Sequence, residues 1–176
     1  IRTARKTDAT DSDWITNSGG FAFNHKYGAG FVDATAAVGL ARTWTNLGAE
    51  VSRTQSSTTS SAIPDNTPAG VARALVISGA GDVRVETVEV TVSVTHANRG
   101  QLQFEVTSPA GTRTVLGSPR AKDTTADFDK WTFSTPRHWG ELANGTWTVR
   151  VIDTVAGTSG TLTAATVAVY GTAAVA

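Results

Sequence analysis

Three side chains near the N-terminus are of the types that carry out hydrolysis, namely Ser18, His25 and Asp33. A serine hydrolase needs a nucleophile on a tight turn, a base within about 3 Å of it and a carboxylate that orients the base. Ser18 is not in a G-x-S-x-G elbow, and Asp33 directly precedes an alanine-rich run, where a helix N-cap is expected. We therefore predict that Asp33 caps a helix and that His25 belongs to the loop before it. A local His25–Asp33 dyad is the alternative.

The other histidines give little sign of a metal site. His96 and His138 are isolated from each other in the sequence, and neither belongs to an H-E-x-x-H motif. His138 precedes Trp139, so we expect it to pack or to form hydrogen bonds rather than to bind zinc. The sequence predicts no catalytic residue in this chain.

Carboxylates cluster once, in KDTTADFDKW, which contains Asp123, Asp127 and Asp129. Oxygen ligands on a loop are what calcium requires, although the EF-hand pattern of glycine and closing glutamate is not present. The cluster predicts a structural calcium site as one alternative. A solvated loop with local Asx turns is the other.

Three tryptophans could form a platform for sugar rings: Trp131, Trp139 and Trp147. Burial in the core or anchoring of loops is the more common role of tryptophan in a small sandwich. Exposure of all three on one face would favour carbohydrate binding, and burial would count against it.

The elements that must position these residues change in type along the chain. Residues 1–33 are polar and irregular, and the spacing of Ala37, Leu40, Ala41 and Trp44 predicts an amphipathic helix over about 34–44. Residues 49–70 are rich in serine, threonine, proline and glycine, which predicts a linker or a long loop. Several short segments after residue 70 alternate apolar and polar side chains, which predicts an antiparallel β-sandwich, with jelly-roll topology the expected form.

Composition excludes several classes of protein. The 176 residues contain 15 Lys and Arg against 15 Asp and Glu, and this balance argues against binding to nucleic acid or to anionic membranes. There is no cysteine and no apolar run of the length of a membrane span. A cysteine-free chain rich in Thr, Ser, Gly and Val suits a secreted or extracytoplasmic protein. The chain begins at Ile1 rather than Met, so we expect it to be a processed or excised piece.

Two stretches together resemble the kexin and furin-like branch of the subtilisin-type serine endopeptidases. NSGGFAFNHKYGAGFVDATAAVGLARTW, at 17–44, is similar to the end of their catalytic domain, where H-x-Y-G-x-G-x-V-D-A leads into the last helix. From about Val83 to Thr172, the motifs S-P-x-G-T, F-x-x-W-x-F-x-T, G-x-W-x-V and the final Y-G-T resemble the P domain of these enzymes. Convertases often carry R-G-D where this chain has Arg99-Gly100-Gln101, so the resemblance does not extend to an integrin-type motif.

The resemblance implies residues 1–48 as the C-terminal tail of a subtilisin-like α/β catalytic domain and residues 71–176 as a P domain. It implies a calcium-dependent, secreted protease whose Asp, His and Ser lie upstream of this chain. The partner of this chain would be that catalytic domain, which binds the protein or peptide substrates, and this part would stabilise and regulate it. The alternative is a cell-surface or carbohydrate-binding β-sandwich with no protease role.

Overall fold

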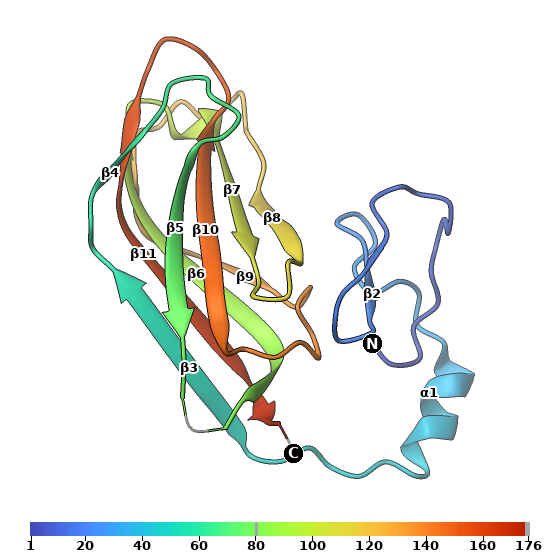
Figure 1. The fold of residues 1–176 in the computed structure, drawn as a ribbon. Helices are drawn as coiled ribbons and strands as arrows, with labels where there is room; N and C mark the ends of the chain where they lie inside the picture. The colour runs from blue at the N-terminus through green and yellow to red at the C-terminus, as the bar shows by residue number, and fades with distance from the viewer. Residues whose placement is uncertain (80, 175–176) are drawn as a thin grey trace.

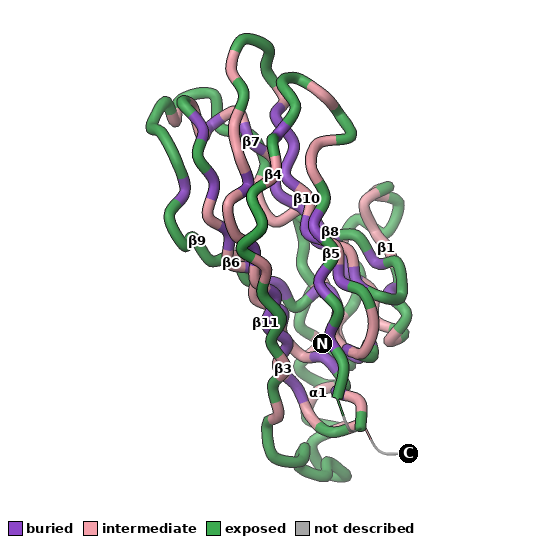
Figure 2. The backbone as a smooth tube through the Cα atoms, turned by 60° about the vertical axis from the view of Figure 1, so that its left-hand side comes forward, coloured by how far each residue is buried: buried purple, intermediate pink, exposed green. Residues whose placement is uncertain are grey.

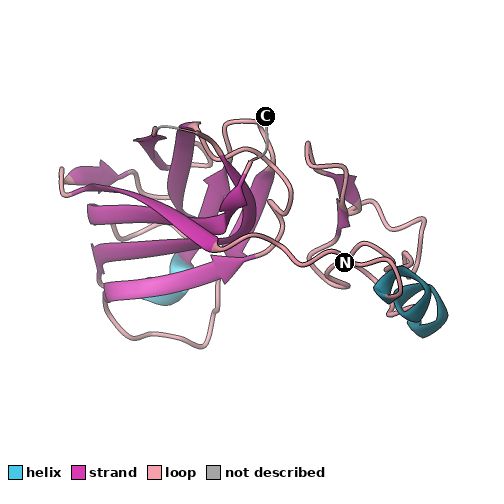
Figure 3. Cartoon of the chain, turned by 90° about the horizontal axis from the view of Figure 1, so that it is seen from below, coloured by secondary structure: helices cyan, strands magenta, loops and turns pink. Residues whose placement is uncertain are grey.

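A computed structural model describes residues 1–79 and 81–174 of the chain. Two antiparallel sheets face each other in a sandwich, and an irregular N-terminal segment lies against one end of it (Figure 1). This segment holds a two-stranded ribbon, β1 (Ile15–Thr16) and β2 (Ala22–Phe23), and the helix α1 (Ala34–Ala41). The helix projects away from the sandwich, as the view from below shows (Figure 3).

The first sheet has the strand order β5-β10-β7-β8, and the second has the order β3-β11-β6-β9 with β4 paired to β11. Their strands are β3 (Glu50–Ser57), β4 (Ser61–Ile63), β5 (Val71–Ile77), β6 (Val83–His96), β7 (Leu102–Thr107), β8 (Arg113–Gly117), β9 (Phe128–Thr135), β10 (Gly145–Asp153) and β11 (Gly160–Ala173). A 3-10 turn, η1 (Arg99–Gln101), precedes β7. The antiparallel sandwich predicted from the alternation is confirmed, and the jelly-roll connectivity stays a prediction.

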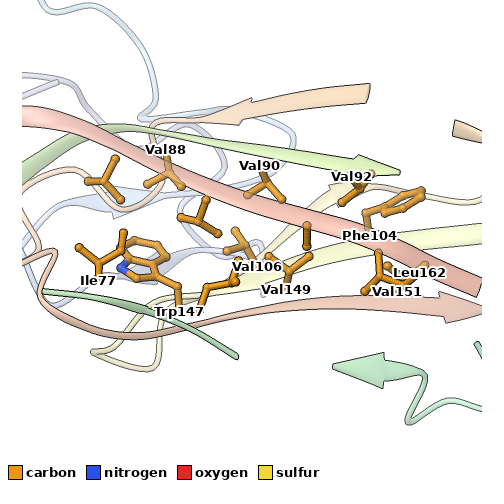
Figure 4. Close-up of a cluster of buried hydrophobic side chains, with 14 of the residues drawn as sticks. Ile77, Val88, Val90, Val92, Phe104, Val106, Trp147, Val149, Val151 and Leu162 are labelled. Atoms are coloured by element: carbon orange, nitrogen blue, oxygen red, sulfur yellow. The ribbon is translucent and has the colours of Figure 1, made fainter. Parts of the chain in front are cut away.

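The core lies between the two sheets and is built from the alternating positions (Figure 4). The alternating sequence pattern predicts which apolar side chains of β6, β7 and β10 face the core. All of them are nearly inaccessible to solvent: Val88, Val90, Val92, Val94, Leu102, Phe104, Val106, Trp147, Val149 and Val151. Trp147 donates from Nε1 to the Ala143 carbonyl at 2.8 Å, so its polar atom is satisfied inside the core. Each such side chain contributes about 1.5–3 kcal/mol to folding by leaving water.

The linker predicted at 49–70 is wrong over much of its length. β3 and β4 lie inside it, and both pair with β11, so the sandwich begins at residue 50 rather than 71. The serine and threonine content is typical of a loop, but here it belongs to the edge strand β3. One face of β3 is exposed to water, and hydroxyl side chains are well tolerated on such a face. Ser56 and Thr166, on neighbouring strands, hydrogen-bond through their hydroxyls at 2.8 Å.

Arg73 ties the turn between β3 and β4 to the opposite sheet. It occupies an inward position of β5 and is 8% exposed. Its guanidinium donates to the Ser57 hydroxyl at 2.7 Å, to the Ser61 hydroxyl at 2.9 Å and to the Thr59 carbonyl. The polar turn is therefore held by a buried cation as well as by strand pairing.

We expect Arg73→Met to destabilise the chain by about 2 kcal/mol, because it removes these charge-assisted hydrogen bonds and keeps most of the apolar stem. Urea unfolding measures the loss, and hydrogen exchange should locate it at residues 57–61. Arg42→Met, at the exposed end of α1, is the control and should change stability little. An unchanged urea midpoint for Arg73→Met would contradict this role.

Candidate functional site

The N-terminal segment meets the sandwich along a contact surface that we call the seam, formed by residues 11–28 on one side and 110–116 and 134–141 on the other. Asn17 is buried there, and its amide donates to the backbone carbonyls of Arg137 at 3.0 Å and Trp139 at 2.9 Å. The backbones approach very closely, because a Cβ added to Gly19 would lie 2.5 Å from the Trp139 carbonyl oxygen. The segment is thus packed against the sandwich as a specific interface.

A buried polar network supports the seam from the sandwich side. Glu141 is 1% exposed and accepts hydrogen bonds from the hydroxyl of Thr112 and, at 3.2 Å, from the backbone N–H of Ser18. His138, which is fully buried, donates from Nδ1 to Glu141 at 3.3 Å, and its Nε2 accepts from Thr114 at 3.1 Å. Burial opposes ionisation of Glu141, but hydrogen bonds from His138, Ser108 and Thr112 outweigh it and lower the pKa to about 2. The expectation that His138 is a hydrogen-bonding residue is confirmed.

His25 bridges the seam, and its partner is Asp13 rather than Asp33. Its Nδ1 lies 2.8 Å from Asp13 Oδ1, and its Nε2 accepts from the backbone N–H of Val115 on β8 at 3.1 Å. Partial burial opposes ionisation of Asp13, but hydrogen bonds from His25 lower its pKa. Because both ring nitrogens are engaged, this imidazole is a structural bridge and is not positioned to activate a nucleophile.

Asp33 caps α1 as the sequence predicts. Its Oδ1 accepts from the backbone N–H of Ala36 at 2.8 Å, and its own backbone is extended. The helix is shorter than predicted and ends at Ala41 rather than near Trp44. A dyad between His25 and Asp33 is therefore not formed, and the helix cap accounts for the aspartate.

The helix and the loop before it expose apolar surface. None of the eight residues of α1, all of which the structure describes, is buried, as Figure 2 also shows by colour. Among the described residues, seven of the eleven large exposed hydrophobic side chains lie in the first 48 positions: Ile1, Tyr27, Phe31, Val32, Val38, Trp44 and Leu47. Val32 is 83% exposed, Phe31 68% and Val38 61%. This is an unusual concentration of unpartnered apolar area.

The predicted helix stripe lines a groove on the same segment. Ala37, Leu40, Ala41 and Trp44 face a cavity of about 370 Å³, whose other walls are formed by residues 1–3, Leu47 and Trp139. Arg2 lies over the Trp44 ring, 5.5 Å from its centroid. The stripe is therefore only partly covered by this chain, and a single amphipathic helix needs a partner surface to bury its apolar side.

The three aspartates of the predicted calcium site lie in different surroundings. Asp123 pairs with Arg99 at 3.1 Å and with Arg120 at 2.9 Å, and hydrogen bonds from Arg99 lower its pKa against the opposing effect of desolvation. Asp127 accepts from the backbone N–H of His96 at 2.8 Å, and Asp129 is exposed on β9. Within residues 1–79 and 81–174, no group of three or more acidic or histidine side chains is arranged to hold a metal ion. The arrangement gives the calcium site no support.

The tryptophans do not form a common platform. Trp147 is fully buried, Trp139 is half-buried beside the seam and Trp131 is 46% exposed on β9. Trp131 packs with its ring centroid 5.8 Å from that of Phe128, so it covers the open edge of the core. In the part of the chain that the structure describes, no helix is long and apolar enough to cross a membrane.

Fold and site together define a two-sheet β-sandwich with an irregular N-terminal segment that is fixed to it by a polar seam and exposes an apolar face. Residues 85–169 match the family model described as the proprotein convertase P-domain, and this part of the chain belongs to that family.

Curated relatives share most of this chain. The PC3-like endoprotease variant B of Hydra vulgaris is 35% identical over 161 residues, which is 87% of this chain and 22% of the relative. The proprotein convertase subtilisin/kexin type 7 of Homo sapiens is 34% identical over 162 residues, 87% of this chain and 20% of the relative. Bovine furin is 33% identical over 184 residues, 98% of this chain and 22% of furin. This chain spans about a fifth of the length of these relatives.

Solved structures agree in fold. A serine protease of Aeromonas sobria, solved in complex with its chaperone, superposes with a TM-score of 0.82 at 25% identity, over 92% of this chain and 33% of the protease. A second structure of that protease gives a TM-score of 0.79 at 24% identity, over 90% of this chain and 33% of the protease. Both matches cover more than the sandwich alone.

Sequence reasoning missed the residues that make the seam, above all Asp13, Asn17, Arg137 and Glu141. Asp13 lies in the irregular segment before β1, and its pairing with His25 follows from a loop geometry that has no periodic signal. His138 and Glu141 are three positions apart in RHWGE, a spacing that a tight turn can bring together, and this was the available signal.

Proposed function

We propose that this chain is the C-terminal part of a secreted kexin or furin-like serine endopeptidase, in which the P-domain sandwich stabilises and regulates the catalytic domain. Residues 1–48 would be the end of that catalytic domain, and the triad would lie upstream. The observation that carries the proposal is the exposed apolar face of this segment, centred on Phe31, Val32 and Val38. An exposed apolar face of this extent calls for a partner surface.

The physical basis of stabilisation is the combination of two interfaces. The seam holds residues 11–28 against the sandwich through hydrogen bonds, and a pair of backbone hydrogen bonds between Arg5 and Phe31 ties the loop before α1 to the same segment. A catalytic domain that buries the exposed side chains would gain about 1.5–3 kcal/mol for each one fully covered. Because the sandwich and the catalytic domain share this segment, unfolding of one would remove support from the other.

Several finer properties are part of the same proposal. Protein or peptide substrates would bind to the catalytic domain. The calcium dependence implied by the resemblance would reside there too, since Asp123 and Asp127 are engaged in other contacts and Asp129 is exposed on β9. Secretion of the protease is likewise proposed. A cell-surface or carbohydrate-binding module is the second candidate, and the full burial of Trp147 counts against it.

We expect Val38→Asp to destabilise the longer protease by about 2 kcal/mol and to shorten its active half-life, because a charge would be placed in the domain interface. In the 176-residue chain alone, the same change should shift the melting temperature by no more than about 1 °C, because Val38 is exposed there. Thermal melting of both proteins and peptidase half-life of the longer one measure the effect.

Val155→Asp is the matched control, because Val155 is 46% exposed in the turn after β10 and far along the chain from α1. This variant should behave alike in the short and the long protein. Equal effects of Val38→Asp and Val155→Asp on the longer protein would contradict the proposed interface.

A further inference from the structure

The seam contains an open cavity of about 570 Å³ between the N-terminal segment and the sandwich. Asp13, Ser18 and His25 line it from one side, and Thr112, Arg113 and Arg137 from the other. We propose that this cavity binds a small carboxylate-type anion on the guanidinium of Arg137. The site goes beyond the proposed stabilising function, since it would let a ligand control how firmly the N-terminal segment is held.

Arg137 is a buried cation with unused hydrogen-bonding capacity. Its side chain is 6% exposed, and among the described residues its Nε is a buried atom without a hydrogen-bond partner. Burial lowers the pKa of Arg137, and the charge of Asp13 raises it only in part. A buried guanidinium with an unpaired N–H is unfavourable unless something accepts from it.

The carboxylate of Asp13 is committed elsewhere. Both of its oxygens lie within 2.9 Å of His25 Nδ1, and Oδ2 also accepts from the backbone N–H of His25. The nearest approach to the Arg137 guanidinium is 3.8 Å, from Nη2 to Asp13 Oδ1. The other contacts of the guanidinium satisfy it poorly. Nη1 lies 3.2 Å from His25 Nδ1, which itself donates to Asp13, and Nη2 lies 3.5 Å from the Asp13 carbonyl.

The unpaired Nε–H of the Arg137 guanidinium determines which kind of ligand fits. Nε–H and a neighbouring Nη–H of a guanidinium are parallel donors that fit the two oxygens of one carboxylate. Arg113 also lines the cavity, but it is held in a bidentate pair by Glu105 and therefore adds little net positive charge. Asp13 repels an incoming anion, so we expect an affinity in the millimolar range rather than tighter.

The direct test is an ¹H–¹⁵N NMR titration of the 176-residue chain that follows the Nε–H of Arg137. Sodium acetate and sodium phosphate are titrated separately, with sodium chloride keeping the ionic strength constant. We expect acetate to shift this resonance with saturation in the millimolar range. No saturable shift with acetate would overturn the proposal, and a response to phosphate alone would overturn the carboxylate assignment.

Thermal melting provides a second readout. We expect acetate to raise the melting temperature of the unmodified chain by about 2 °C, and to do the same for the charge-matched control Arg42→Gln. Arg137→Gln should lose this rise, and an equal rise in Arg137→Gln would contradict the site. If Arg137→Gln does not fold, the NMR titration of the unmodified chain decides the question.

Discussion

Replacement of Glu141 by alanine is expected to destabilise the chain by about 4 kcal/mol, one of the largest effects of any single substitution. The change leaves the buried Thr112 hydroxyl and His138 ring without their acceptor, and it also removes the acceptor of the partly buried Ser18 N–H. The Ser18 bond crosses the seam, so the N-terminal segment should also loosen. Urea unfolding measures the free energy, and hydrogen exchange at residues 17–25 measures the loosening.

Glu141 also makes the stability of the folded chain depend on pH in the acid range. The pKa of Glu141 is about 2 when folded against 4.5 unfolded, so its ionised form stabilises the folded state by about 3 kcal/mol above pH 4.5. A lowered folded pKa means that this contribution falls as pH drops from about 4.5 to 2. Glu141→Gln should be less stable at neutral pH and should flatten this part of the curve. The exposed Glu50→Gln should leave the curve unchanged, and a steep acid transition retained in Glu141→Gln would contradict the assignment.

Trp147→Ala should destabilise the chain by about 4 kcal/mol, because it removes the largest fully buried side chain of the core. The cavity would open between the two sheets, where Trp147 meets the ring of His138 with centroids 5.1 Å apart. The indole also satisfies the Ala143 carbonyl, which the substitution leaves without that donor.

Trp131→Ala is the matched control for Trp147→Ala, because it removes the same atoms from a position that is 46% exposed. We expect it to lower stability by about 1 kcal/mol, through the lost contacts with Phe128 and Phe133. Chemical unfolding of both variants gives the comparison. Similar losses for the two would mean that the core is not where the structure places it.

The sandwich was predictable because its inward positions repeat every two residues, as from Val88 to Val94 on β6. The cap at Asp33 was predictable because it depends on a local side-chain hydrogen bond. The strands β3 and β4 were not predictable, because a strand with a solvated face can have the composition of a loop. Their structure is decided by pairing with β11, about a hundred residues away in the sequence. The seam was not predictable for the same reason: Asp13 and Arg137 meet only after the fold is complete.

The central claim is that this chain completes and stabilises a subtilisin-type protease, and it is tested most directly on the coding sequence extended upstream of Ile1. We expect the extension to encode segments with an Asp-Gly pair, a His-Gly-Thr and a Gly-Thr-Ser in that order, and its product to cleave Arg-containing peptides. Deletion of residues 50–176 should then shorten the active half-life of that product severalfold. An upstream region without these segments, or a half-life that the deletion does not change, would contradict the account.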